Sequence, residues 1–102
     1  MQLSQSFKNT SLSTGTMLTE DLIPTFFSFL EEHAPGHAKH VLLYDDYRMI
    51  LEDDEPDYES ENAYWLLEHL FAELNDIAPD DCWFSSHEGD GSDYGFWECI
   101  DY

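Results

Sequence analysis

The chain has 102 residues, of which 42% are hydrophobic and 16% aromatic, and 23 Asp and Glu residues against three Lys and Arg give it a formal net charge of −20. This length fits one domain with a single core, and the apolar content excludes the composition of a disordered acidic tail. The charge excludes direct binding to nucleic acid or to an anionic membrane, because both would repel the protein.

The first 17 residues are rich in Ser and Thr and hold few apolar side chains. Two alternatives fit them: an extended segment around residues 9–17 that joins a sheet edge, or a loose N-terminus. We expect one domain over residues 1–102, with residues 1–8 as its candidate flexible end. The start lacks the basic and apolar regions of a signal peptide, and no apolar run approaches 18 residues, so we expect a cytoplasmic protein.

Three helices are predicted from apolar residues that recur every three or four positions. Their ranges are roughly 20–33, 37–53 and 60–77. The first has Thr19 or Asp21 as its cap and ends before Pro35-Gly36. The second has a broad apolar stripe, and the third, capped by Ser60, has the most regular spacing of the three.

The C-terminal segment predicts a β-hairpin with arms at roughly 82–87 and 94–100, because aromatic-rich arms flank Asp90-Gly91, a pair that suits a type I′ turn. With these two residues as the loop, the opposite pairs are Cys82 with Cys99, Trp83 with Glu98, Phe84 with Trp97 and Ser85 with Phe96. The face that covers the helices then holds Cys82, Phe84, Trp97 and Cys99. A pair of buried thiols and a disulfide are the alternatives for the two cysteines. The predicted class is α+β, three helices packed on a small antiparallel sheet built on this hairpin.

The chain contains no Gly-rich phosphate loop, no nucleophile elbow and no calcium-loop spacing, so we expect neither an enzyme nor a cofactor. His33, His37 and His40 are separated by four and three residues, but Pro35-Gly36 breaks the helix between the first two. A surface role is therefore favoured over metal ligation, and no metal site is predicted. The two remaining histidines are isolated along the sequence, His69 and His87.

The segment EDDEPDYESE, residues 52–61, holds seven carboxylates and no basic side chain. Pro56 disfavours a helical conformation of the residue before it, so this run connects the second and third helices. A linker needs no such concentration of charge, and a cation site needs fixed geometry, so a surface that meets a basic partner is favoured. Tyrosines beside the acids add amphipathic contacts and cation-π faces. The predicted partner-binding residues are Asp45, Asp46, Glu52, Asp53, Asp54, Glu55, Asp57, Tyr58, Glu59 and Glu61, with Asp90 and Asp93 as a second patch.

Twenty uncompensated charges equal those of about 34 Å of duplex DNA. In charge, length and lack of a catalytic motif the chain resembles the small acidic DNA-mimic inhibitors of phages and mobile elements, the anti-restriction and anti-CRISPR proteins. Its segment YGFWE after GDGSD is similar to sequences in acidic phage-type proteins. The resemblance implies an inhibitor, acting in the cytoplasm of a bacterial host, that occupies the DNA-binding or PAM-reading surface of a basic defence protein such as a Cas effector or a restriction-modification enzyme. Two alternatives stay open: an immunity protein or antitoxin that neutralises a basic nuclease toxin, and an acidic cation-binding or structural protein.

Overall fold

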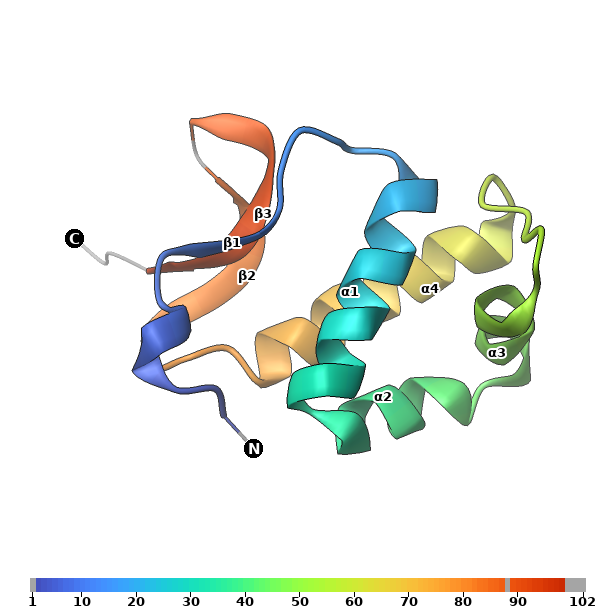
Figure 1. The fold of residues 1–102 in the computed structure, drawn as a ribbon, viewed down its shortest axis with the longest axis horizontal. Helices are drawn as coiled ribbons and strands as arrows, with labels where there is room; N and C mark the ends of the chain where they lie inside the picture. The colour runs from blue at the N-terminus through green and yellow to red at the C-terminus, as the bar shows by residue number, and fades with distance from the viewer. Residues whose placement is uncertain (1, 88, 99–102) are drawn as a thin grey trace.

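The computed structural model describes residues 2–87 and 89–98 (Figure 1). Within these residues, a three-stranded antiparallel sheet lies at one end of a molecule 42 Å long, and four helices fill the rest. The predicted α+β class and the C-terminal hairpin are therefore confirmed, with one helix more than expected.

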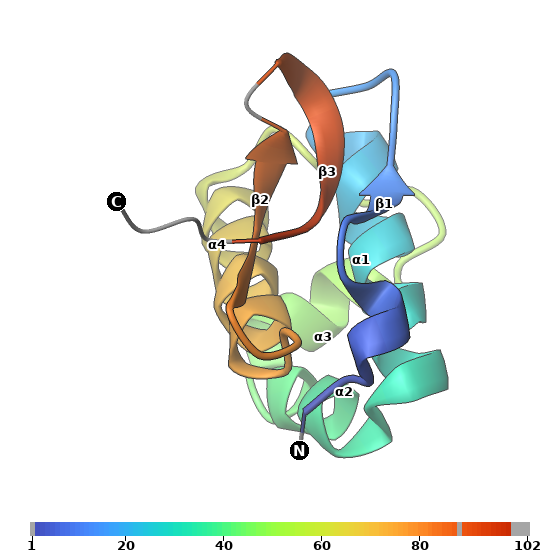
Figure 2. The same cartoon turned by 90° about the vertical axis from the view of Figure 1, so that its left-hand side faces the viewer.

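The helices are α1 (Thr19–His33), α2 (Pro35–Leu42), α3 (Asp45–Glu52) and α4 (Glu61–Asp76). Viewed from the sheet side, α1 and α4 lie behind the sheet (Figure 2). Their apolar stripes meet the sheet in one core, at whose centre the Phe26 ring of α1 packs edge-on against Phe84 and Phe71, with ring centroids 5.0 and 5.4 Å away. The core thus forms where the two long helices cross the inner face of the sheet.

The single helix predicted over residues 37–53 is wrong, because the chain breaks between α2 and α3. Tyr44 is extended, with φ −92° and ψ 113°, and a new helix starts at Asp45. Asp45 and Asp46 occupy the first turn of α3, where the positive end of the helix dipole favours carboxylates. These two acids were a helix-start signal inside the broad apolar stripe that made the region look continuous.

The ends of the other helices test the predicted caps. Neither Thr19 nor Asp21 caps α1: the N-cap position is Leu18, whose N–H donates to the Thr16 hydroxyl at 3.1 Å. Ser60 does cap α4, since its hydroxyl accepts a hydrogen bond from the Ala63 N–H at 3.2 Å.

The strands are β1 (Thr10–Ser13), β2 (Cys82–His87) and β3 (Asp90–Glu98), and their order is β1-β3-β2. Of the two alternatives for the N-terminus, the strand at a sheet edge is confirmed, since Thr10 lies opposite Phe96. Before it, a 3₁₀ turn spans Gln5–Phe7, and the buried Leu3 donates its N–H to the Ile77 carbonyl at 2.8 Å.

The hairpin register differs by one residue from the prediction. Cys82 lies opposite Glu98 and Phe84 opposite Phe96, so the predicted Cys82–Cys99 pairing is wrong, and Cys99 itself lies outside the described residues. Asp90 already belongs to β3, and the pairing is irregular after Ser86, so Asp90-Gly91 is not the loop. One consequence is that Phe96, 1% exposed, faces the core in place of Trp97.

Gly95 allows close packing on the central strand β3. A Cβ at this position would lie 2.2 Å from the Thr10 carbonyl oxygen of β1 and 2.9 Å from the Trp97 indole. The glycine therefore lets β1 and the indole approach the central strand on its outer face, and the Trp97 N–H donates to the Ser85 carbonyl at 2.9 Å.

In the part of the chain that the structure describes, no helix is both long enough and apolar enough to span a bilayer.

Candidate functional site

The acids predicted to bind a partner lie on α3, on the connection from α3 to α4 and at the start of α4. These elements form the end of the molecule opposite the sheet (Figure 1). All of these acids are exposed, whereas Tyr58 is half-buried against the core. We call the exposed set the acidic end: Asp45, Asp46, Glu52, Asp53, Asp54, Glu55, Asp57, Glu59 and Glu61.

The second predicted patch does not join the acidic end. Asp90 is exposed at the start of β3, at the other end of the molecule (Figure 1). Its pKa is lowered, first by a hydrogen bond from the Ser92 N–H and then by one from the Ser92 hydroxyl. Asp93 is only half-exposed, and one of its carboxylate oxygens is buried with no hydrogen-bond partner among the described residues. The structure thus brings together ten of the twelve predicted residues.

The connection between α3 and α4 is held by its own aspartates. The Asp53 carboxylate accepts a hydrogen bond from the Glu55 N–H at 3.0 Å, and the Asp57 carboxylate accepts one from the Glu59 N–H at 3.1 Å. Both contacts are Asx turns, in which a side chain satisfies the backbone two residues on. The acids of this connection, from Asp53 to Glu59, are therefore displayed on a folded loop.

Basic side chains barely offset this charge. Arg48 is the one Lys or Arg after residue 39 in the sequence, and it forms an ion pair with Asp45 at 2.7 Å. Lys8 pairs with Glu98 beside the sheet. Every Asp and Glu that the structure describes is exposed except Glu73 and Asp93. The acidic end therefore keeps most of its negative charge.

Exposed apolar side chains surround the acidic end. Trp65, in the first turns of α4, is 51% exposed, and Leu43 and Met49 are more exposed still.

Between the starts of α3 and α4 lies a cavity of about 420 Å³, whose lining residues are Tyr44, Asp45, Asp46, Tyr47, Asn62 and Trp65. Burial, then the neighbouring Tyr44 and Asp46, raise the pKa of Tyr47. The sequence reasoning did not assign Tyr64 or Trp65 to the surface, although they lie outside the apolar stripe of the third helix.

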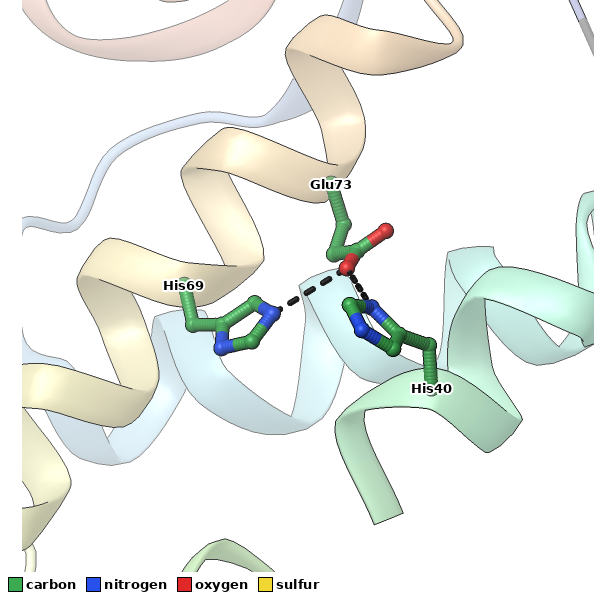
Figure 3. Close-up of side chains that lie close together, drawn as sticks. All are labelled: His40, His69 and Glu73. Carbon is green, nitrogen blue, oxygen red and sulfur yellow. Dashed lines mark hydrogen bonds and ion pairs between the residues drawn. The ribbon is translucent and has the colours of Figure 1, made fainter. Parts of the chain in front are cut away.

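A second cluster, unlike anything predicted, lies between α2 and α4 (Figure 3). Glu73 of α4 is 7% exposed, and its carboxylate meets three imidazoles, of which Figure 3 draws those of His40 and His69. His37 Nδ1 lies 2.6 Å from Oε2, His69 Nε2 lies 3.1 Å from Oε1, and His40 Nδ1 also bonds Oε1. His69 is therefore not isolated. His37 and His40 do not only face solvent, as predicted, but also form hydrogen bonds with Glu73.

The charge state of Glu73 follows from two opposing effects. Burial raises its pKa, but the hydrogen bonds from His37, His40 and His69 together outweigh burial, so the pKa is lowered overall. An ionised carboxylate can only accept hydrogen bonds, so each facing ring nitrogen donates a proton.

The sequence did contain a signal for this cluster. Glu73 interrupts the apolar stripe of α4, which includes Leu66, Leu70 and Leu74, and a buried acid requires partners. His69 precedes it by one turn, and His37 and His40 share a face of α2. The cluster could not be predicted, because the sequence does not show that α2 packs against α4.

No protein-family model, curated protein or solved structure matches this chain.

Proposed function

We propose that this protein binds the nucleic-acid-binding surface of a basic protein and inhibits it, by presenting the acidic end where that protein expects phosphates. The class of target that fits is a defence protein such as a Cas effector or a restriction-modification enzyme, blocked at its DNA-binding or PAM-reading surface. One observation carries the proposal: nine exposed carboxylates share one end of the molecule, with Arg48 as the basic residue within that stretch of sequence.

Charge density supports this proposal. A net charge of −20 along a 42 Å axis is about one charge per 2 Å, close to the charge per about 1.7 Å of duplex DNA. A groove that attracts phosphates would attract this surface in the same way. Association is then expected to be fast and to weaken as salt is added.

The exposed aromatic residues provide binding energy that exposed charges alone do not. Exposed carboxylates mainly raise association rates, whereas most binding energy at interfaces comes from a few side chains, among which Trp and Tyr are enriched. Tyr44 and Trp65 line the cavity within the acidic end. A basic protein that inserts an Arg or Lys there would meet both carboxylates and ring faces.

The test compares two variants with the same charge. The first replaces five acids of the acidic end by their amides, Glu52, Asp53, Asp54, Glu55 and Glu59. Asn at position 53 keeps the side-chain oxygen of the Asx turn, and Glu61 stays because it occupies the first turn of α4.

The matched control replaces five exposed acids elsewhere, Glu31, Glu32, Asp76, Asp80 and Asp81. Removal of five charges takes either variant from −20 to −15, so the two variants have the same net charge. Wild type, variant and control are immobilised, exposed to lysate of a bacterium with restriction and CRISPR systems, and eluted with salt or with duplex DNA.

The proposal requires that wild type and control retain the same DNA-binding protein, that duplex DNA displaces it, and that the acidic-end variant loses it. The purified wild type must also abolish DNA binding by the captured protein in a mobility-shift assay. Equal capture by both variants, or unimpaired DNA binding by the captured protein, refutes it. Capture of a toxin nuclease would favour an immunity protein or antitoxin.

A further inference from the structure

We propose that His40, His69 and Glu73 form a binding site for a divalent transition-metal ion, with Zn²⁺ as the ion that fits best. The site lies between α2 and α4 (Figure 3), and none of its three ligands belongs to the acidic end. Its ligand atoms are His40 Nδ1, His69 Nε2 and Glu73 Oε1, which all lie within 4.8 Å of one another.

The types of donor select the metal. Imidazole nitrogens suit Zn²⁺ and its transition-metal neighbours, whereas Ca²⁺ and Mg²⁺ prefer sites made of oxygen ligands. Two nitrogens and one carboxylate oxygen, with a further position open, match the three-ligand sites that zinc occupies in proteins. Among the residues that the structure describes, no other group of three or more His, Cys, Asp and Glu side chains is placed to hold an ion.

The geometry needs only a local adjustment. Tetrahedral bonds of about 2.0–2.1 Å place ligand atoms about 3.3 Å apart. His69 Nε2 and Glu73 Oε1 are already 3.1 Å apart, and His40 Nδ1 forms a hydrogen bond with the same oxygen. The ion would replace the hydrogen-bonding protons, each of which moves to the other nitrogen of its ring. His40 is half-exposed and can shift outward to make room.

His37 completes the site without binding the ion. Its Nδ1 donates to the second carboxylate oxygen, Oε2, at 2.6 Å, which leaves Oε1 for the metal. Hydrogen bonds of this kind orient ligands and raise metal affinity. His37 is therefore a positioning residue.

The cluster is also reachable from solvent. Beside it lies a cavity of about 430 Å³, with a lining of Ala34, Pro35, Gly36, His37, His40, Glu73 and Asp76. The cavity gives an ion a route to Glu73 and leaves space for a water molecule as fourth ligand. The net charge of −20 raises the local concentration of cations around the protein.

The test uses the full chain, freed of metal with EDTA and dialysed. Calorimetry with ZnCl₂ at physiological salt should give one site per chain, whereas CaCl₂ and MgCl₂ should give only weak heats without a defined stoichiometry. Nitrogen chemical shifts of the imidazole rings should identify Nδ1 of His40 and Nε2 of His69 as the bound atoms. This pairing of unlike ring nitrogens is specific to the proposed geometry.

Variants complete the test. His40→Ala should weaken Zn²⁺ binding more than about 100-fold, and His37→Ala about 10–100-fold, the usual effect of losing an orienting partner. His87→Ala removes an exposed histidine of the hairpin and should bind as wild type does. Circular dichroism checks that each variant is folded; if His40→Ala unfolds, Glu73→Gln, which keeps the shape of the side chain, takes its place.

Three outcomes would overturn the proposal. They are unchanged Zn²⁺ affinity in folded His40→Ala or Glu73→Gln, loss of the site in the five-residue variant of the acidic end, and ring shifts that place the ion on the wrong nitrogens. The second outcome would assign the ion to the exposed acids instead.

Discussion

Gly95→Ala tests the sheet register and the N-terminal strand together. The added Cβ would lie 2.2 Å from the Thr10 carbonyl oxygen and 2.9 Å from Ser11 Cα, whereas carbon and oxygen ordinarily touch at more than 3 Å. The strand β1 would have to move back by about 1 Å or leave β3. Overpacking of this kind costs about 1–3 kcal/mol, partly offset by the better strand propensity of Ala, worth about 0.5–1 kcal/mol.

The measurement is the free energy of unfolding in urea, together with the melting temperature. A net loss of 1–2 kcal/mol corresponds to a fall of about 4–16 °C for a domain of about 100 residues. Gly91→Ala is the matched control in the same strand, because its Cβ would meet no described atom within 4 Å. We expect that control to stay within about 0.5 kcal/mol of wild type. If both variants unfold at the same urea concentration, β1 does not pack against Gly95 as described.

Two further predictions concern α4. Because hydrogen bonds lower the folded-state pKa of Glu73, its ionised form stabilises the fold above the ordinary carboxyl pKa of about 4.3 and loses this effect as pH falls through the folded value. Glu73→Gln should therefore lower the free energy of unfolding by about 1–3 kcal/mol at pH 7 in EDTA. Urea unfolding at a series of pH values should show that the difference in this free energy between variant and wild type shrinks below about pH 4. A difference that stays constant with pH would contradict this prediction. Asn75→Ala should lower the free energy of unfolding by about 1–3 kcal/mol, because the Asn75 side chain forms hydrogen bonds with both the N–H and the carbonyl of Phe84 at the edge of β2. Hydrogen exchange of the Phe84 amide should become faster in the variant. Unchanged exchange would contradict the prediction.

The fold class was predictable because periodicity reports which faces are apolar. The α4 helix and its Ser60 cap were predicted well, since the spacing is regular and the capping residue is explicit. The hairpin register was not, because Phe96 and Trp97 are both apolar and either could face the core. Which of the two faces the core depends on contacts between distant parts of the chain, such as the packing of β1 against Gly95.

Of the two candidate sites, one was predictable from the sequence and the other was not. The acidic end was predictable because its residues are neighbours in sequence, and local chain geometry keeps them together. The cluster around Glu73 joins α2 to α4 across 33 residues of chain, from His40 to Glu73, so its formation depends on helix packing. Spacing along one helix indicated the pair His37 and His40, whereas His69 was predicted to be isolated, because local spacing does not report which helices pack together.

The Asx turns between α3 and α4 affect the thermodynamics of any association at the acidic end. Ordering a flexible loop costs about 1–2 kcal/mol of backbone entropy per residue, and a partner that had to impose the loop conformation would lose that much affinity. Here Asp53 and Asp57 fix the backbone before any partner arrives. Binding should therefore show the small heat-capacity change of rigid-body docking, without the larger negative change that accompanies coupled folding.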